Sequence, residues 1–149
     1  MMLQDYIKEE TILEDAFCKD WEEVVDAGCN LLIRQGAIGE AYKHAIKAAV
    51  EEFGGYMVLI DDIAFFHGRP GNGVYRLAMS LVTLREPVYL KEKRIKAAFV
   101  FAALDNSSHM ELLQEFGEAL QDESFLKLLR ENGGKDAILK KIKEGEDKR

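Results

Sequence analysis

The chain has 149 residues, of which 48% are hydrophobic, so it has the size of one domain and enough apolar side chains for a single core. Its 20 Lys and Arg against 27 Asp and Glu give a formal net charge of −7, which disfavours nucleic acid and anionic lipid and suits a basic protein partner or simple solubility. No apolar run approaches the roughly 20 residues that span a bilayer, and the N-terminal residues lack a signal-peptide pattern, so we expect a cytoplasmic protein without direct membrane insertion. Cys18 and Cys29 have no C-x-x-C spacing and are interpreted as reduced packing residues.

The first third of the chain predicts one strand and two helices. A short apolar segment at residues 11–17 favours a strand, and Asp20 followed by Glu23 matches a helix N-cap with its reciprocal carboxylate. Apolar residues at three- and four-residue steps predict a helix from Trp21 that Gly36 ends, and then a second helix over residues 42–53.

The middle of the chain predicts strands. Residues 56–60 and 63–66 are short apolar runs on either side of two aspartates, which indicates two strands around a turn. Residues 74–84 alternate in polarity and predict a long strand. Residues 97–104 are apolar without interruption, which is typical of a strand covered by helices on both faces, so we expect this strand to be central in the sheet.

Helices are expected in the rest of the chain. Ser108 and Glu111 have capping-box spacing ahead of an apolar stripe over residues 110–120, and two shorter helices are expected over residues 122–131 and 135–142. The charged tail, about residues 143–149, is expected to be disordered. Helices before, between and after the strands predict one α/β domain over residues 1–149, with helices on both faces of a sheet in three α/β/α layers.

The three histidines differ in their sequence context. His44 lies off the apolar stripe of the second predicted helix, so we interpret it as a surface residue. His67 stands where an apolar strand gives way to a loop with three glycines, which permit close approach by another molecule and expose the imidazole. Arg69 is two residues further on, and its guanidinium has paired donors for an oxyanion such as a phosphoryl group. The alternative is a histidine that only caps a turn.

His109 falls at the start of a predicted helix, directly after the predicted central strand. Ligands gather at the carboxyl ends of strands in open α/β sheets, and free N–H groups at a helix start bind anions. The helix dipole disfavours a protonated imidazole there, so His109 should stay neutral and donate one N–H. The alternative is a histidine that merely occupies a helix N-terminus.

Nucleotide and metal chemistry find little support. The pattern G-x-x-x-x-G-K-[ST] does not occur, and the glycines at residues 71–73 lead into a strand rather than a helix. A metal site at the two loop histidines would need further ligands, for which the nearby candidates are Asp61, Asp62 and Asp105. We therefore expect neither a cofactor nor a metal.

Four segments together resemble the mannitol/fructose class of enzyme IIA of the phosphoenolpyruvate-dependent sugar phosphotransferase system. They are residues 53–59, residues 64–70 with the sequence AFFHGRP, residues 81–87, and residues 102–109, which end in the second histidine motif. The resemblance covers about residues 11–131. Where the mannitol-type pattern carries an Arg-Glu pair, this chain has Glu51-Glu52-Phe53, which favours the ascorbate-specific branch. The resemblance implies a mixed sheet of about four to five strands between helical layers.

The resemblance also implies a phosphotransferase activity and roles for the residues that match the family motifs. His67 would accept a phosphoryl group from the histidine phosphocarrier protein and pass it to a cysteine of enzyme IIB, with membrane enzyme IIC as an indirect partner. His109 and Arg69 would stabilise the phosphoryl group, and amides around Gly68 and Ser108 are candidate oxyanion donors. The transported sugar would be ascorbate or a related sugar acid or pentitol.

One position departs from the family pattern, because Phe66 stands where the family usually has proline. Side chains alternate along a strand, so Phe65 and Phe66 should lie on opposite faces and at least one should be in the core. Two other functions are open: a nitrogen-type enzyme IIA-like regulator that acts through phosphorylation-dependent protein binding, and a degenerate homologue in which Phe66 has disabled the site.

Overall fold

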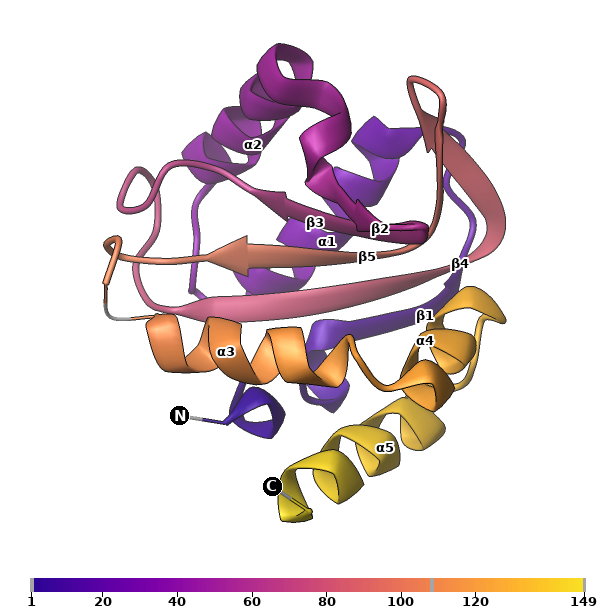
Figure 1. The fold of residues 1–149 in the computed structure, drawn as a ribbon. Coiled ribbons are helices and arrows are strands. Elements are labelled where there is room, and N and C mark those ends of the chain that lie inside the picture. Colours follow the sequence, from indigo (N-terminus) through magenta and orange to yellow (C-terminus); the bar gives the residue numbers. More distant parts are fainter. Residues whose placement is uncertain (1, 108, 149) are drawn as a thin grey trace.

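The computed structural model describes residues 2–107 and 109–148, and Figure 1 shows how they fold. The strands are β1 (Ile12–Ala16), β2 (Val58–Ile60), β3 (Asp62–His67), β4 (Ala78–Leu90) and β5 (Lys93–Ala102). The helices are α1 (Trp21–Arg34), α2 (Glu40–Phe53), α3 (Met110–Ala119), α4 (Glu123–Arg130) and α5 (Lys135–Asp147). Short 3₁₀ turns cover Leu3–Asp5, Glu9–Thr11 and Gly54–Met57.

The strands form one mixed sheet in the order β1-β4-β5-β3-β2. β1 is parallel to β4 and β3 is parallel to β5, whereas the β4–β5 and β2–β3 pairs are antiparallel. β5 therefore lies in the middle of the sheet, as its uninterrupted apolar run predicts. Because β3 and β5 are parallel, their carboxyl ends meet at the same edge.

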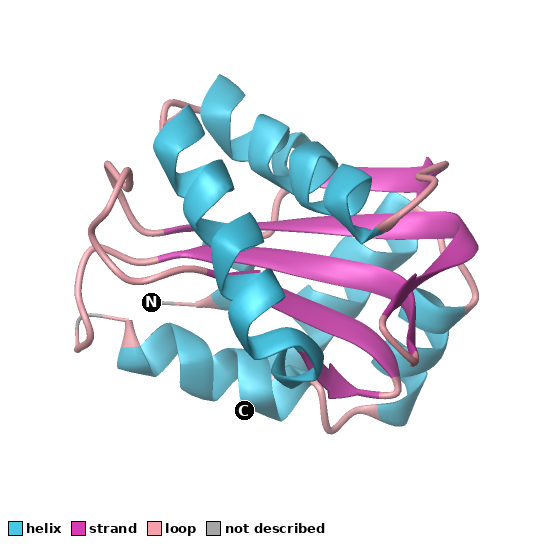
Figure 2. Cartoon of the chain, turned by 90° about the horizontal axis from the view of Figure 1, so that it is seen from above, coloured by secondary structure: helices cyan, strands magenta, loops and turns pink. Residues whose placement is uncertain are grey.

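Helices cover both faces of the sheet, which confirms the predicted three-layer α/β fold. α1 and α2 lie across one face and α3, α4 and α5 lie across the other, as the two views show (Figures 1 and 2). Alternate residues of β5 enter two separate core clusters: Ala98, Val100 and Ala102 on the α1/α2 side, and Ala97, Phe99 and Phe101 on the α3/α5 side. No helix in the described part of the chain has both the length and the apolar character needed to cross a membrane.

α1 begins at the predicted N-cap and packs directly on the sheet. The Asp20 carboxylate accepts a hydrogen bond of 2.9 Å from the Glu23 N–H, whereas the Glu23 carboxylate accepts from the Lys19 N–H and not from the cap residue. A Cβ on Gly28 would come within 2.5 Å of a Val100 methyl group, so this glycine permits the close approach of α1 to β5.

Both cysteines are free and buried, as expected for packing residues. Cys29 lies in α1, and burial raises the pKa of its thiol to about 12. The thiol therefore stays protonated near neutral pH, where only the thiolate is an effective nucleophile.

β4 differs from its sequence prediction at both ends. It begins at Ala78 rather than at residue 74, and it continues to Leu90, where a tight turn with Lys91 at φ 55° leads into β5. The register with β5 shifts between Thr83 and Val88, and Arg85 in this stretch is exposed. Because the apolar alternation is interrupted here, the sequence pattern does not predict the second half of β4.

The prediction of a disordered tail is wrong for the part of it that the structure describes. α5 continues through Asp147, and the Glu146 side chain is buried and accepts a 2.9 Å hydrogen bond from the Gln4 N–H. This contact joins residues at opposite ends of the sequence, so the local charge pattern could not reveal it.

The α4 N-cap gives a testable pH dependence. The Asp122 carboxylate accepts hydrogen bonds from the Ser124 hydroxyl and from the Ser124 and Phe125 N–H groups, and these lower its pKa below the ordinary value of 3.8. A depressed folded-state pKa contributes stability that is present above the unfolded-state value and is lost as the pH falls through the folded-state value. We therefore expect the free energy of unfolding to fall as the pH drops below about 4.

Urea unfolding between neutral and acidic pH measures this effect. Asp122→Asn keeps a good N-cap without a titrating carboxyl, so its unfolding free energy should vary less steeply with pH in the acid range than that of the wild type. Equal slopes for the two proteins would show that Asp122 does not contribute to the acid sensitivity.

Candidate functional site

His67 is the last residue of β3 and lies at the carboxyl edge of the sheet, opposite Phe101 of β5. Its ring is partly exposed, and its Nδ1 lies 3.0 Å from the carbonyl oxygen of Phe65. A carbonyl oxygen only accepts, so in this hydrogen bond Nδ1 carries the proton. In the neutral ring the lone pair is therefore on Nε2, which makes Nε2 the nucleophilic nitrogen.

Phe65 and Phe66 are both buried, and they face opposite sides of the sheet as predicted. Phe66 belongs to the cluster under α1 and α2 and pairs with Val100 of β5. Phe65 belongs to the other cluster, where its ring contacts the His67 ring at a centroid distance of 5.2 Å. Phe66 thus fills the core on the face away from the imidazole, and its packing leaves the His67 ring partly exposed.

His109 is the N-cap residue of α3 and is only 8% exposed. Its ring meets the Phe101 ring edge to face at 5.4 Å, and Phe101 stacks at 5.5 Å on Phe65, which in turn contacts His67. The two histidines are therefore joined by two neighbouring aromatic rings on one face and at one end of the sheet. In Figure 1 the loops that follow β3 and β5 project from this end, where α3 begins.

One nitrogen of the buried His109 ring has no hydrogen-bond partner among the described residues. This atom is Nδ1. A buried polar atom without a partner is costly in a folded protein, and such atoms recur where a ligand or a reacting group completes the bonding. His109 is buried at the start of α3, where the sequence places it, and its role as a donor stays a prediction.

Arg69 is exposed in the loop that begins after His67. Within residues 2–107 and 109–148, its guanidinium makes no ion pair or hydrogen bond. A guanidinium without protein partners has its donors available for an incoming oxyanion. The position of Arg69 therefore agrees with its predicted role, which stays a prediction.

The two candidate oxyanion amides have different outcomes. The Gly68 N–H donates to the Tyr42 hydroxyl at 2.9 Å, so it is engaged inside the fold and we assign it no part in binding an oxyanion. Ser108 lies outside the described residues. The prediction for Gly68 fails because a tyrosine from α2, distant in the sequence, reaches this amide.

The loop glycines fit closely against α2, whereas the sequence suggested space for another molecule. A Cβ on Gly68 would lie 3.1 Å from a ring carbon of Tyr42, and a Cβ on Gly73 would lie 2.7 Å from the Tyr42 nitrogen. Gly73 also has φ 79°, which favours glycine. Tyr42 is therefore a residue of the site that the sequence did not predict, because it is part of the apolar pattern that predicted the second helix.

Acidic residues do not complete a metal site at His67. Asp62 begins β3, at the other end of the strand from His67, and its carboxylate contacts Arg94 at 2.9 Å and Arg130 at 3.7 Å. Among the described residues, no three His, Cys, Asp or Glu side chains are grouped so as to hold a metal ion.

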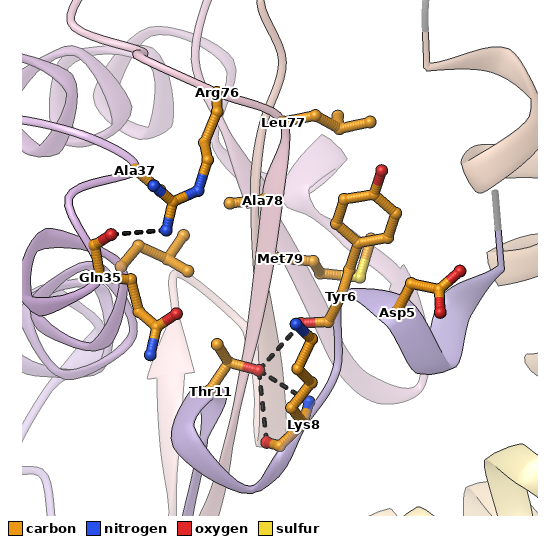
Figure 3. Close-up of a pocket in the computed structure, with 11 residues that line it drawn as sticks. Asp5, Tyr6, Lys8, Thr11, Gln35, Ala37, Arg76, Leu77, Ala78 and Met79 are labelled. Atoms are coloured by element: carbon orange, nitrogen blue, oxygen red, sulfur yellow. Dashed lines mark hydrogen bonds between the residues drawn. The ribbon is translucent and has the colours of Figure 1, made fainter.

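A cavity of about 340 Å³ lies beside the start of β4, between the N-terminal segment and the end of α1 (Figure 3). Two of its polar side chains are hydrogen-bonded to the backbone of other lining residues: the Thr11 hydroxyl bonds the Tyr6 and Lys8 backbone, and Arg76 donates to the Gln35 carbonyl. None of the predicted site residues lines it. The candidate site is therefore the histidine-bearing edge of the sheet and not this cavity.

Comparison with known proteins supports the class that the fold and the two histidines indicate. The family model described as "Phosphoenolpyruvate-dependent sugar phosphotransferase system, EIIA 2" matches residues 5–145. The chain belongs to this enzyme IIA family and is a phosphotransferase component.

The chain is similar to enzyme IIA proteins of two sugar specificities. It is 34% identical to a mannitol-specific cryptic phosphotransferase enzyme IIA component of Escherichia coli K12, over 87% of this chain and 89% of the relative. It is 32% identical to an ascorbate-specific PTS system EIIA component of the same organism, over 87% and 88% of the two chains.

Solved structures agree with this assignment. The solution structure of the mannitol-specific cryptic enzyme IIA from Escherichia coli matches with a TM-score of 0.83 and 31% identity, over 95% of this chain and 98% of that one. A complex of mannitol enzyme IIA with phosphorylated enzyme IIB from Escherichia coli matches with a TM-score of 0.77 over 91% and 97% of the chains, and its 20% identity supports the fold alone.

Proposed function

We propose that this chain is a cytoplasmic phosphoryl carrier that accepts the group on His67 from the histidine phosphocarrier protein and passes it to a cysteine of enzyme IIB. Family membership supports the carrier role, and the complex of a structurally similar enzyme IIA with phosphorylated enzyme IIB supports the acceptor. The structural observation that carries the proposal is the hydrogen bond from His67 Nδ1 to the Phe65 carbonyl, which leaves Nε2 of a partly exposed ring as the nucleophile.

Transfer to His67 exchanges one N–P bond for another. The Nε2 lone pair attacks phosphorus as the donor's N–P bond breaks, and that electron pair returns to the donor's ring nitrogen. The ring of His67 gains positive character, which the Nδ1–H···O hydrogen bond to Phe65 stabilises. In the second step the sulfur of the enzyme IIB cysteine forms an S–P bond as the Nε2–P bond breaks.

Arg69 and His109 are the residues that we propose stabilise the phosphoryl group. Arg69 is exposed and has no partner in the described part of the chain, so its paired N–H donors can follow the group as proteins dock and leave. His109 is buried beside Phe101, and a neutral ring there can donate one N–H without strong reorganisation. A membrane enzyme IIC would take part only indirectly.

The surface near the site has apolar side chains that suit a protein partner. Leu104 and Met110 flank the loop before α3 and are 47% and 61% exposed, and Tyr75 in the loop before β4 is 67% exposed. Exposed aliphatic and aromatic residues around a reacting group fit docking by another protein. The net charge of −7 favours a donor whose docking face is basic.

For the transported sugar, we propose ascorbate or a related sugar acid or pentitol. The Glu51-Glu52-Phe53 segment favours the ascorbate branch, and similarity to ascorbate-specific and cryptic mannitol-specific components is nearly equal. The relatives named above are components of sugar systems, so we do not propose the nitrogen-type regulatory function.

A reconstituted phosphotransferase assay tests the function. The protein is incubated with phosphoenolpyruvate, enzyme I and the histidine phosphocarrier protein, and intact mass then measures phosphate uptake before and after acid treatment. We expect one acid-labile phosphoryl group, lost again when a cognate enzyme IIB is added. No uptake would exclude the carrier function, whereas uptake without transfer to any enzyme IIB would favour a regulator.

A further inference from the structure

Tyr42 occupies the first turn of α2, and its buried hydroxyl connects the two chain segments that form the site. The hydroxyl donates to the Phe101 carbonyl at 2.6 Å and accepts from the Gly68 N–H at 2.9 Å. The side chain is 1% exposed, and burial raises its pKa to about 12, so the hydroxyl stays protonated near neutral pH. It can therefore donate and accept at the same time.

Both partners of this hydroxyl are adjacent to the proposed phosphoryl acceptor. Gly68 is the residue after His67, and Phe101 is the residue that pairs with His67 across the β3–β5 ladder. The ring of Phe101 also contacts the ring of His109. One hydroxyl thus bonds the backbone of the residue after His67 and the backbone of the β5 residue that pairs with His67.

Two glycines of the loop after His67 allow it to pack closely against Tyr42. A Cβ at Gly68 would crowd the Tyr42 ring at 3.1 Å, and a Cβ at Gly73 would clash with the Tyr42 backbone nitrogen at 2.7 Å. The Gly73 carbonyl also accepts a 2.9 Å hydrogen bond from the Gly39 N–H just before α2. The loop after His67 therefore packs against the first turn of α2. Because the backbone after His67 is fixed in this way, the His67 imidazole has less freedom to rotate.

We propose that Tyr42 is a positioning residue for phosphoryl transfer, fixing the backbone around His67 so that Nδ1 stays bonded to Phe65 and Nε2 faces the incoming phosphorus. This inference deepens the proposed function and rests on it. Phosphoryl transfer depends mainly on placement of the reacting atoms, and a misplacement of about 1 Å can cost roughly 10²-fold in rate.

The test compares Tyr42→Phe with Ser80→Ala. Tyr42→Phe removes only the hydroxyl and leaves the Gly68 N–H and the Phe101 carbonyl without this partner. Ser80→Ala removes another buried hydroxyl, which donates to the Gly28 carbonyl of α1 at 2.8 Å rather than to the backbone around His67. Thermal unfolding of the two variants compares the structural cost of losing one buried hydrogen bond.

Two readouts separate positioning from stability. We expect Tyr42→Phe to slow phosphoryl uptake from the phosphorylated carrier by about 10- to 100-fold, with the carrier concentration for half-maximal rate unchanged. In the unphosphorylated protein, ¹H–¹⁵N NMR of the His67 ring should show the single Nδ1–H form in the wild type and a mixture of tautomers in the variant. Ser80→Ala should leave both the rate and the ring spectrum unchanged.

A wild-type transfer rate and ring spectrum in Tyr42→Phe would overturn the inference, as would an equal effect of Ser80→Ala. If Tyr42→Phe does not fold, Gly68→Ala replaces it, because its Cβ would press on the Tyr42 ring. Like Tyr42→Phe, Gly68→Ala is expected to give a mixture of His67 tautomers and a slower transfer rate. An unchanged spectrum and rate would overturn the inference. The ring spectrum is recorded without phosphate, so it tests the positioning role of Tyr42 separately from the carrier function. Failure of the carrier function would instead appear as no phosphate uptake by the wild type.

Discussion

A His67→Gln variant is expected to take up no phosphoryl group from the phosphorylated carrier, a loss of at least about 10³-fold in transfer rate. Glutamine keeps a polar side chain of similar size at the end of β3, so the fold should persist, but its amide has no lone pair that attacks phosphorus. Intact mass and radiolabel transfer measure uptake. The partly exposed position of His67 makes a large loss of stability unexpected.

His44→Gln is the matched control. His44 is an exposed histidine on α2, and its replacement should leave the transfer rate at the wild-type value. Acid-labile phosphate on His67→Gln, or its loss in His44→Gln, would show that the acceptor is misassigned.

The second large effect is expected at His109. His109→Ala should slow transfer by about 10²-fold, because it removes one preorganised donor for the charge that develops on the phosphoryl oxygens. The carrier concentration for half-maximal rate should change little, since the ring is buried beside Phe101 and contributes little to the docking surface. Transfer assays quenched at set times, at several carrier concentrations, measure the transfer rate and the carrier concentration for half-maximal rate.

His109→Gln is the control for loss of packing at this position. It retains an N–H donor and much of the side-chain volume, so its rate should lie between those of the wild type and His109→Ala. A wild-type rate for His109→Ala would make His109 a structural residue, and equal rates for the two variants would show that the donor is not what matters.

The sequence predicted the features of the fold that depend on local pattern. The uninterrupted apolar run at residues 97–104 indicated the central strand, and Asp20 marked the start of α1. It did not predict the β4–β5 hairpin, because the register shift breaks the alternation on which that prediction rests. The helical end of α5 was missed because a contact between Gln4 and Glu146 stabilises it.

At the candidate site, the sequence identified residues whose positions the structure describes, whereas their roles stay predictions. His67 and His109 stand out in sequence because each follows an apolar strand and precedes a loop or helix start, and the parallel pairing of β3 and β5 explains why both reach one edge of the sheet. The part that Tyr42 plays depends on a tertiary hydrogen bond to Gly68, which no periodicity reports. The same hydrogen bond occupies the Gly68 N–H. The wrong prediction for Gly68 and the missed role of Tyr42 therefore have one cause.

The proposed carrier function requires a bond between Nε2 of His67 and phosphorus, and NMR can detect this bond. Heteronuclear NMR of the phosphorylated, ¹⁵N-labelled protein locates the nitrogen that is coupled to phosphorus. We expect the coupling at Nε2 of His67, with Nδ1 still protonated and bonded to the Phe65 carbonyl. Coupling at Nδ1, or phosphorus on any other residue, would show that Nε2 of His67 is not the acceptor.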